Sequence, residues 1–174
     1  MNTRFEQLVD QHGHRLLQVA RLMLQRADEA EDVVQDSLIK LWNHLPKLRI
    51  GDELPWLITC TRNACLDRLR ARTRTRTLLR LVAGQQQALA PDAEPGPDLR
   101  MLSEQRSRLI REAIAGLAEP GRSLLILRDI QELDVATVAR ALDLSENQVK
   151  VYTFRARRSL RRHLEEENAH EQVA

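Results

Sequence analysis

The sequence predicts an all-α fold, made of two small helical domains joined by a flexible linker. Helix breakers and aromatic residues are scarce, with 6 Gly, 6 Pro and 3% aromatic residues in a chain of 174. No segment alternates apolar and polar residues, as the strands of a half-buried sheet do. A segment rich in Gln and Pro between Gly84 and Pro97 interrupts the helical periodicity and divides the chain.

The N-terminal half predicts three helices. The first spans about residues 3–24, where apolar residues recur at spacings of three and four. The second begins near Asp28 with a run of carboxylates, which suit the positive end of the helix dipole, and ends at Pro46. The third starts around Glu53 or Pro55. Its outer side carries a largely polar stripe formed by Trp56, Cys60, Asn63, Asp67 and Arg70.

The C-terminal half predicts four helices. One spans about residues 99–117 and a second runs through residues 124–130. The last two have the pattern of a helix-turn-helix, in which the small Ala139 lets the helices approach closely and Ser145 caps the second helix. Asp143 stands where many such turns have glycine, and aspartate enters the left-handed region with a modest penalty.

The helices and the interruption set the predicted domain boundaries. The first domain covers residues 1–80, the linker 81–100, the second domain 101–164 and a tail 165–174. The charge and proline content of the linker predict an extended tether, so we expect the domains to reorient until a partner fixes them. The tail matches no pattern from which a role follows.

The net charge of +2 hides two basic tracts. Seven arginines lie between Arg62 and Arg80 beside the single carboxylate of Asp67, and six cations lie between Lys150 and Arg162 with no carboxylate. Two such tracts favour two contacts with a polyanion, although solvated helix faces often look similar. If the second helix of the helix-turn-helix enters a major groove, the residues facing bases are Glu146, Asn147, Gln148, Lys150, Val151, Phe154 and Arg155, and those facing phosphates are Arg157, Arg158, Arg161 and Arg162.

The sequence contains no motif that is typical of an enzyme active site or a metal site. Cys60 and Cys65 form no CxxC pair, and we expect them to be small buried apolar residues. The five histidines form no HExxH motif or Cys/His set, and no Gly-rich phosphate loop is present. We therefore expect no catalytic residues, no metal site, no cofactor and no small-molecule substrate. No signal peptide or transmembrane segment is recognisable, which favours the cytoplasm.

Three blocks together resemble the signature of extracytoplasmic-function (ECF) sigma factors of the sigma-70 superfamily. They are residues 28–42, residues 55–70 and the helix-turn-helix, in the order and spacing of the family, and the resemblance covers roughly residues 3–164. It implies a sigma factor that binds core RNA polymerase and directs promoter-specific transcription initiation. Region two, in the first domain, would recognise the minus-ten element of promoter DNA, and region four, in the second, the minus-thirty-five element.

Matching motifs carry the family's roles to single residues. The segment that docks on the polymerase corresponds to Glu29, Glu31, Asp32, Gln35 and Asp36. The alternative, a simple interaction of charges with the helix dipole, contributes under about 1 kcal/mol at an exposed site. The minus-ten surface corresponds to Lys47 and Arg49, in a loop at residues 47–54 that captures a flipped base, and to Arg62, Asn63, Asp67 and Arg70, with Arg68 and Arg72 as further backbone contacts. Trp56 either stacks on DNA or completes the core, and we favour the core.

Two departures and two alternatives accompany the resemblance. Leu38 replaces a usual Phe, and residues 135–137 replace usual acidic residues, which puts a partner contact there in doubt.

A stand-alone helix-turn-helix regulator would use the same C-terminal helices, but it leaves the acidic pattern of residues 28–36 unexplained. An anti-sigma factor or enzyme is the weaker alternative. The family also implies an anti-sigma factor as a partner. It would hold the chain inactive and, where it is linked to the inner membrane, would keep the chain there.

Overall fold

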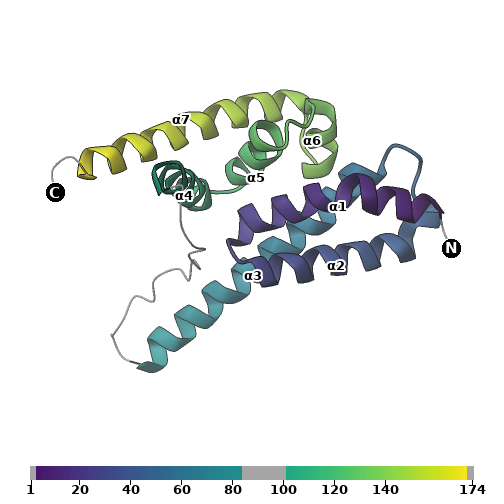
Figure 1. The fold of residues 1–174 in the computed structure, drawn as a ribbon, viewed down its shortest axis with the longest axis horizontal. Coiled ribbons are helices and arrows are strands. Elements are labelled where there is room, and N and C mark those ends of the chain that lie inside the picture. Colours follow the sequence, from purple (N-terminus) through teal and green to yellow (C-terminus); the bar gives the residue numbers. More distant parts are fainter. Residues whose placement is uncertain (1–2, 84–100, 172–174) are drawn as a thin grey trace. The chain divides into compact units, whose positions relative to one another are not determined.

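The computed structural model describes residues 3–83 and 101–171. Within these two ranges the regular secondary structure is helical, and no strand is present. The chain divides into two compact units, up to Pro95 and from Gly96 onward, which we call the N-terminal and C-terminal units. Figure 1 labels the helices of both. The all-α prediction is confirmed, whereas the predicted tether at residues 84–97 lies outside the described residues.

The N-terminal unit is a bundle of three helices. It contains α1 (Thr3–Leu24), α2 (Ala27–His44), the short 3-10 turn η1 (Leu45–Lys47) and α3 (Glu53–Ala83). The predicted bounds of the first helix and the predicted start of the third are confirmed. Each helix packs against the other two, and η1 with Pro46 ends α2. The helix α3 extends past residue 80, where the first domain was predicted to end.

The apolar stripes of the three helices meet in one core. Leu16 and Met23 of α1, Leu41 of α2, and Leu57 and Ile58 of α3 are all fully buried. Burial of one such side chain contributes roughly 1.5–3 kcal/mol. Further along α3, Thr61 and Cys65 continue the buried side, and burial raises the pKa of the Cys65 thiol to about 12. Cys60 is only half-buried, on the opposite side of α3.

One histidine lies inside this core. His12 of α1 is 7% exposed, and its Nδ1 atom has no hydrogen-bond partner. Burial, and then the charge of Arg15, hold the pKa of His12 below its ordinary value of 6.5, while the carboxylate of Glu53 acts in the opposite direction. The folded unit therefore favours the neutral imidazole.

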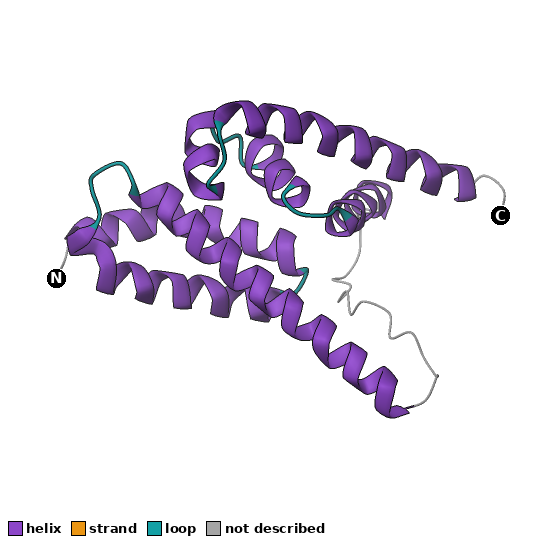
Figure 2. Ribbon diagram, turned by 180° about the vertical axis from the view of Figure 1, so that it is seen from behind, coloured by secondary structure: helices purple, strands orange, loops and turns teal. Residues whose placement is uncertain are grey.

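The C-terminal unit contains four α-helices and a short π-helical segment. They are α4 (Met101–Gly116), α5 (Gly121–Leu125), η2 (Ile126–Ile130), α6 (Val135–Leu142) and α7 (Glu146–Glu171). Figure 2 shows the short loops that join them. The helix predicted through residues 124–130 is present, but it is π-helical from Ile126 onward. The N–H of Gln131 donates to the Ile126 carbonyl five residues earlier, at 2.9 Å.

The core of this unit forms where α5 packs against α7 and η2 packs against α5 and α6. Residues 124–127 are almost completely buried, as are Val149, Thr153 and Ala156 of α7. A Cβ atom at Gly121 would lie 3.3 Å from the Cβ of Ala156, so glycine permits this close approach. The helix α7 continues to Glu171, into the segment treated as a tail, because no Gly or Pro interrupts it.

Local contacts fix both ends of α6 and the start of α7, and the left-handed Asp143 and the Ser145 cap are those that the sequence predicts. Asp134 caps α6 by accepting a hydrogen bond from the N–H of Thr137 at 2.8 Å. Asp143 ends α6 in the left-handed conformation, with φ 53°. The Ser145 hydroxyl accepts from the N–H of Gln148 at 3.1 Å, which confirms the predicted cap. Together these contacts set the angle at which α7 leaves the turn.

The buried histidine makes the stability of the N-terminal unit depend on pH. Because the folded-state pKa of His12 is lowered, stability is full above about pH 6.5 and is lost as the pH falls below that value. The loss for one proton is at most about 1.4 kcal/mol per pH unit. We expect His12→Leu to flatten the dependence, measured by urea unfolding followed through Trp42 and Trp56, which both lie in this unit. The exposed His14→Leu should keep the slope; equal slopes in both variants would contradict this account of His12.

Candidate nucleic-acid and protein interfaces

The helix α7 presents an exposed face opposite its buried one. Val149, Thr153 and Ala156 face the core. The eleven residues predicted to contact DNA from this helix are all exposed: Glu146, Asn147, Gln148, Lys150, Val151, Phe154, Arg155, Arg157, Arg158, Arg161 and Arg162. Phe154 is 68% exposed, an unusual position for a large aromatic side chain. The face combines apolar, amide and cationic groups, which suits the major groove.

Gln148 has a structural role that the sequence analysis missed. Its side-chain oxygen accepts a hydrogen bond from the N–H of Ser145 at 2.8 Å, while its own N–H donates to the Ser145 hydroxyl. This reciprocal pair is a capping box, and the Ser-x-x-Gln spacing is its sequence signal. The acceptor atom of Gln148 is therefore engaged at the start of α7. Asn147, which has no such role, is the more available amide for contact with bases.

Two adjacent arginines of α7 differ in their surroundings. The guanidinium of Arg157 donates to both carboxylate oxygens of Asp129 in η2, at 2.8 and 2.5 Å. The hydrogen bonds with Asp129 raise the pKa of Arg157 above its ordinary value. Arg158 is exposed on another side of the helix. Arg157 thus fastens α7 to η2, whereas Arg158 faces solvent.

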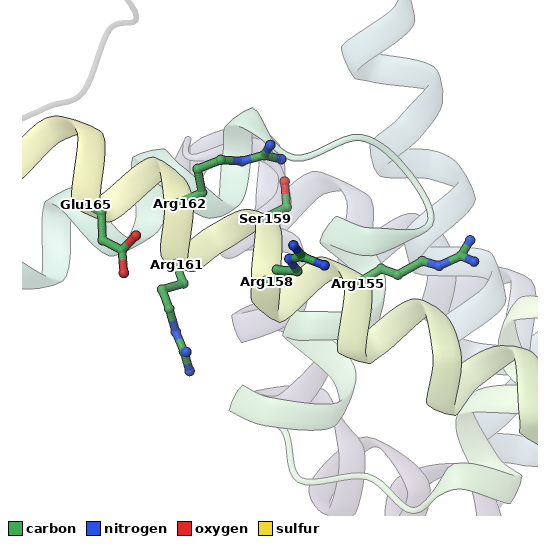
Figure 3. A pocket seen from close by; sticks show the side chains of 6 residues that line it. All are labelled: Arg155, Arg158, Ser159, Arg161, Arg162 and Glu165. Atoms are coloured by element: carbon green, nitrogen blue, oxygen red, sulfur yellow. The ribbon is translucent and has the colours of Figure 1, made fainter.

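A shallow hollow lies on the basic end of α7. It is lined by Arg155, Arg158, Ser159, Arg161, Arg162 and Glu165, all from this one helix. Figure 3 shows the arginine side chains spread around the helix rather than converging on one point. Such an arrangement holds no small ligand in a defined pose. It provides spread positive charge and a hydroxyl, which is what contact with a phosphate backbone requires.

The outer side of α3 carries the predicted polar stripe. Asn63, Asp67 and Arg70 are exposed, and Arg62 is half-buried. Neighbours on the helix interact: Arg70 pairs with Asp67 at 3.0 Å, and Arg62 donates to the Asn63 side-chain oxygen at 3.4 Å. The stripe therefore offers an amide and cations on one face, away from the core.

Trp56, at the start of the same stripe, has a partner that the sequence analysis missed. Its ring is half-buried and stacks on the exposed imidazole of His44, with centroids 5.2 Å apart and planes 7° from parallel. Trp56 is thus part surface and part core. His44 lies at the end of α2, and no periodic pattern marks it in the sequence.

The predicted base-capture loop is exposed at its tip. Lys47 and Arg49 are exposed, and Ile50 is 89% exposed. Gly51 follows with φ 94°, a conformation that favours glycine. The loop therefore presents two cations and an aliphatic side chain to solvent.

The predicted docking surface on α2 is exposed but carries ion pairs within the chain. Glu31, Asp32, Gln35 and Asp36 are exposed. Arg21 of α1 pairs with Glu31 at 3.0 Å, and Arg68 of α3 lies 3.4 Å from Asp32 and 3.9 Å from Asp36. Exposed pairs of this kind contribute about 0–1 kcal/mol, so a basic partner can displace them.

Glu29 differs from the other carboxylates of this set. It is half-buried and pairs with Arg72 of α3 at 2.6 Å. The same guanidinium donates to the carbonyl of Leu24 at 3.1 Å, at the end of α1. Arg72 therefore joins all three helices at one point, and Glu29 serves the fold of the unit as well as its surface charge.

The described ranges hold neither a metal-ligand cluster nor a membrane-spanning helix. Within residues 3–83 and 101–171, no three His, Cys, Asp or Glu side chains are grouped so that they could hold a metal ion. In the same ranges, no helix has the length and apolar character that spanning a bilayer requires.

Each of the two units matches a known protein family. Residues 8–75 match the family Sigma-70 region 2, and residues 107–160 match Sigma-70, region 4. The ECF RNA polymerase sigma factor SigL of Mycobacterium tuberculosis is 31% identical over 163 residues, which cover 91% of this chain and 88% of SigL. SigW of Bacillus subtilis, also an ECF RNA polymerase sigma factor, is 26% identical over 167 residues, or 92% and 88% of the two chains.

Other relatives extend the comparison. A protein of Xanthomonas campestris named "Probable RNA polymerase sigma factor RfaY" is 32% identical over 136 residues, but this chain spans only 34% of its length. Among solved structures, the sigma factor RpoE in complex with the anti-sigma factor NepR from Bartonella quintana matches with a TM-score of 0.68 and 25% identity, covering 93% of this chain and 97% of RpoE. CnrH in complex with the cytosolic domain of CnrY has the same fold, with a TM-score of 0.67, 23% identity and 94% and 90% coverage.

The different surroundings of Arg157 and Arg158 lead to opposite expectations. We expect Arg158→Ala to weaken DNA binding by the complex of this chain with core RNA polymerase. The slope of log affinity against log salt concentration should fall by about one, as it does when one phosphate contact is lost. We expect Arg157→Ala to change that slope less and to lower the stability of the C-terminal unit, measured by thermal unfolding. The reverse ranking of the two variants would contradict these assignments.

Proposed function

This chain belongs to the extracytoplasmic-function sigma factors of the sigma-70 family, and we propose that it recruits core RNA polymerase to specific promoters and starts transcription there. The observation that carries the proposal is the presence, in one chain, of both matched regions with their polar surfaces exposed on α3 and α7. A sigma factor regulates transcription through a partner enzyme and needs no catalytic residues of its own. Its place of action would be the cytoplasm, where the polymerase works.

Recognition of the minus-thirty-five element is assigned to α7. The turn fixed by Asp143 and Ser145 presents Asn147, Lys150 and Phe154 from the first turns of the helix. Amide and cationic groups there suit base edges, and an exposed aromatic or aliphatic side chain suits a thymine methyl. Arg155, Arg158 and the cations beyond them supply phosphate contacts.

Opening of the minus-ten element is assigned to α3 and the loop before it. A base leaves the stack at a cost of a few kcal/mol, which polar contacts and a basic surface can offset. Asn63 and Arg70 on α3, with Lys47 and Arg49 of the loop, provide those groups on an exposed surface. Asp67 pairs with Arg70, and because both side chains are largely exposed the pair is weak and leaves the guanidinium available to DNA.

Docking on the polymerase is assigned to Glu31, Asp32, Gln35 and Asp36 of α2. The carboxylates of Glu31, Asp32 and Asp36 are exposed and only weakly held by Arg21 and Arg68, so they remain available to a basic surface of the enzyme. Glu29 supports this surface through its pair with Arg72. An anti-sigma factor that covers these surfaces would keep the chain inactive, and the likeness to RpoE in its complex with NepR supports such a partner.

The proposal is tested by transcription with purified components. We expect core polymerase plus this chain to give a run-off transcript from a genomic fragment upstream of its own gene, and neither component alone to do so. Operator binding by the chain without polymerase, and no transcript from any native fragment, would favour a stand-alone helix-turn-helix regulator instead.

The role of Asn63 has its own test. We expect Asn63→Ala to lower run-off transcription from duplex promoter DNA by about tenfold, because an interaction made only during opening is lost. A template with a premelted minus-ten element should restore the activity. The matched control is Gln7→Ala, an exposed amide on α1. Unchanged transcription by Asn63→Ala from duplex DNA would remove Asn63 from the opening surface.

The docking surface is tested by charge reversal. We expect Asp36→Lys to weaken binding of the fluorescently labelled chain to core polymerase by about tenfold at low salt, with a smaller difference at high salt because exposed charges are screened. Asp10→Lys reverses an exposed charge on α1 and serves as the control. Equal affinity of both variants for core polymerase would place the docking surface elsewhere.

A further inference from the structure

Arg157 lies on the exposed side of α7 but is bound to another element of the unit. It follows Lys150 by seven residues and Phe154 by three, so helical periodicity places the three residues on one side of α7. The side chain of Arg157 is 57% exposed. Its guanidinium nevertheless donates to both carboxylate oxygens of Asp129 in η2, at 2.8 and 2.5 Å. A cation in the position of a DNA contact is thus engaged within the chain.

The neighbouring arginines of α7 are not engaged in this way. Of the five arginines between residues 155 and 162, all but Arg157 line the shallow hollow on the helix: Arg155, Arg158, Arg161 and Arg162. Among the residues that the structure describes, no ion pair or side-chain hydrogen bond holds any of these four guanidinium groups. Four cations of the basic tract are therefore available to phosphates, and the fifth is held.

The pair of Arg157 with Asp129 is stronger than the exposed ion pairs on α2. It uses both carboxylate oxygens, and such two-point charged hydrogen bonds are among the strongest in proteins. The side chain of Asp129 is 31% exposed, against 65% for Asp32 and 62% for Asp36. A carboxylate that is partly shielded from solvent is unfavourable without a partner. Arg157 must therefore leave a favourable contact before it can reach a phosphate.

The segment around Asp129 holds its carboxylate in position. Ile126 and Leu127, at the start of η2, are buried in the core of the unit. The N–H of Leu133 donates to the carbonyl of Leu127 at 3.0 Å and ties the end of the segment to its start. These contacts keep Asp129 from following Arg157 toward DNA. The carboxylate is therefore a fixed partner of the guanidinium.

We propose that Asp129 limits the affinity of the chain for DNA by holding Arg157 away from the phosphate backbone. The inference rests on the proposed function, because it concerns the duplex that α7 would contact. It goes further by assigning a role to a carboxylate outside the predicted DNA-contacting residues. Each phosphate that a cation neutralises releases counterions and adds a sequence-independent term to the affinity. Asp129 keeps this term smaller and so shortens the residence of the chain on DNA of every sequence.

The test is DNA binding by the holoenzyme, assembled from core polymerase and this chain, as a function of salt concentration. Fluorescence anisotropy with a labelled promoter duplex, mapped by run-off transcription, gives the slope of log affinity against log salt concentration. We expect Asp129→Asn to steepen this slope by about one and to strengthen binding by about fivefold at low salt, because the released Arg157 neutralises one more phosphate. A duplex with a scrambled minus-thirty-five element should show the same change.

A second background separates the release of Arg157 from the removal of a negative charge. Arg157→Gln leaves no cation to release, so adding Asp129→Asn to it should leave the slope unchanged. Repulsion of DNA by Asp129 itself would instead act in both backgrounds. The matched control is Glu132→Gln, which removes an exposed carboxylate three residues after Asp129 and should not steepen the slope.

A variant on the other side of the pair covers loss of folding. Thermal unfolding of every variant is measured. If Asp129→Asn proves unstable, Arg157→Lys carries the test, because lysine keeps the cation but cannot form the two-point contact. We expect Arg157→Lys to steepen the slope by up to about one, since its ammonium group is held less firmly by Asp129.

The results distinguish the inference from the proposed function. No transcript from any native fragment with the unaltered chain would refute the proposed function, and with it the inference. Unchanged slopes in both Asp129→Asn and Arg157→Lys, in a holoenzyme that transcribes the promoter, would overturn the inference alone. Equal steepening by Asp129→Asn with Arg157 present and with Arg157→Gln would also overturn it, because the carboxylate would then act through its own charge.

Discussion

The burial of one side of α3 against α1 and α2 is the constraint on which the N-terminal unit depends. Leu57, Ile58 and Cys65 fix the rotation of α3 about its own axis, because they must lie in the core. That rotation leaves Asn63, Asp67 and Arg70 on the opposite side, exposed to solvent. It also turns Arg68 and Arg72 toward the carboxylates of α2. The proposed promoter surface and the proposed docking surface are thus consequences of a single packing arrangement.

Charged residues have two different roles in this structure, support of the fold and binding of partners. Glu53 and Glu29 are shielded from solvent and hold loops and helix ends in place through arginines that lie far away in the sequence. The pairs of Arg21 and Arg68 with α2 are exposed and weak, so they lower the negative charge of the surface in the free chain without obstructing a partner. In the C-terminal unit, Arg157 also supports the fold through its contacts with Asp129, although its side chain is exposed. The partner of a charged residue, as well as its exposure, therefore separates residues that support the fold from those free to bind.

Much of the fold was predictable from local sequence signals. Apolar periodicity predicted the helix from Thr3 to Leu24, and turn chemistry predicted the left-handed Asp143 and the cap at Ser145, because both depend on adjacent residues. Contacts between distant residues were not predictable: Arg157 and Arg158 are adjacent and chemically equal, and only the position of Asp129 distinguishes them. The roles of the exposed residues came from family resemblance, and their contacts with partners remain proposals.

The most direct test of this arrangement is site-specific photo-crosslinking from the outer side of α3. A photoreactive amino acid is placed at Asn63, or at the exposed Arg21 of α1 as a control, and the holoenzyme is assembled on promoter DNA. We expect Asn63→p-benzoylphenylalanine to crosslink to the non-template strand of the minus-ten element, and the variant at Arg21 to give no such product. Absence of that crosslink in a holoenzyme that binds the promoter, or equal crosslinking from both positions, would contradict the assignment of α3 to promoter opening.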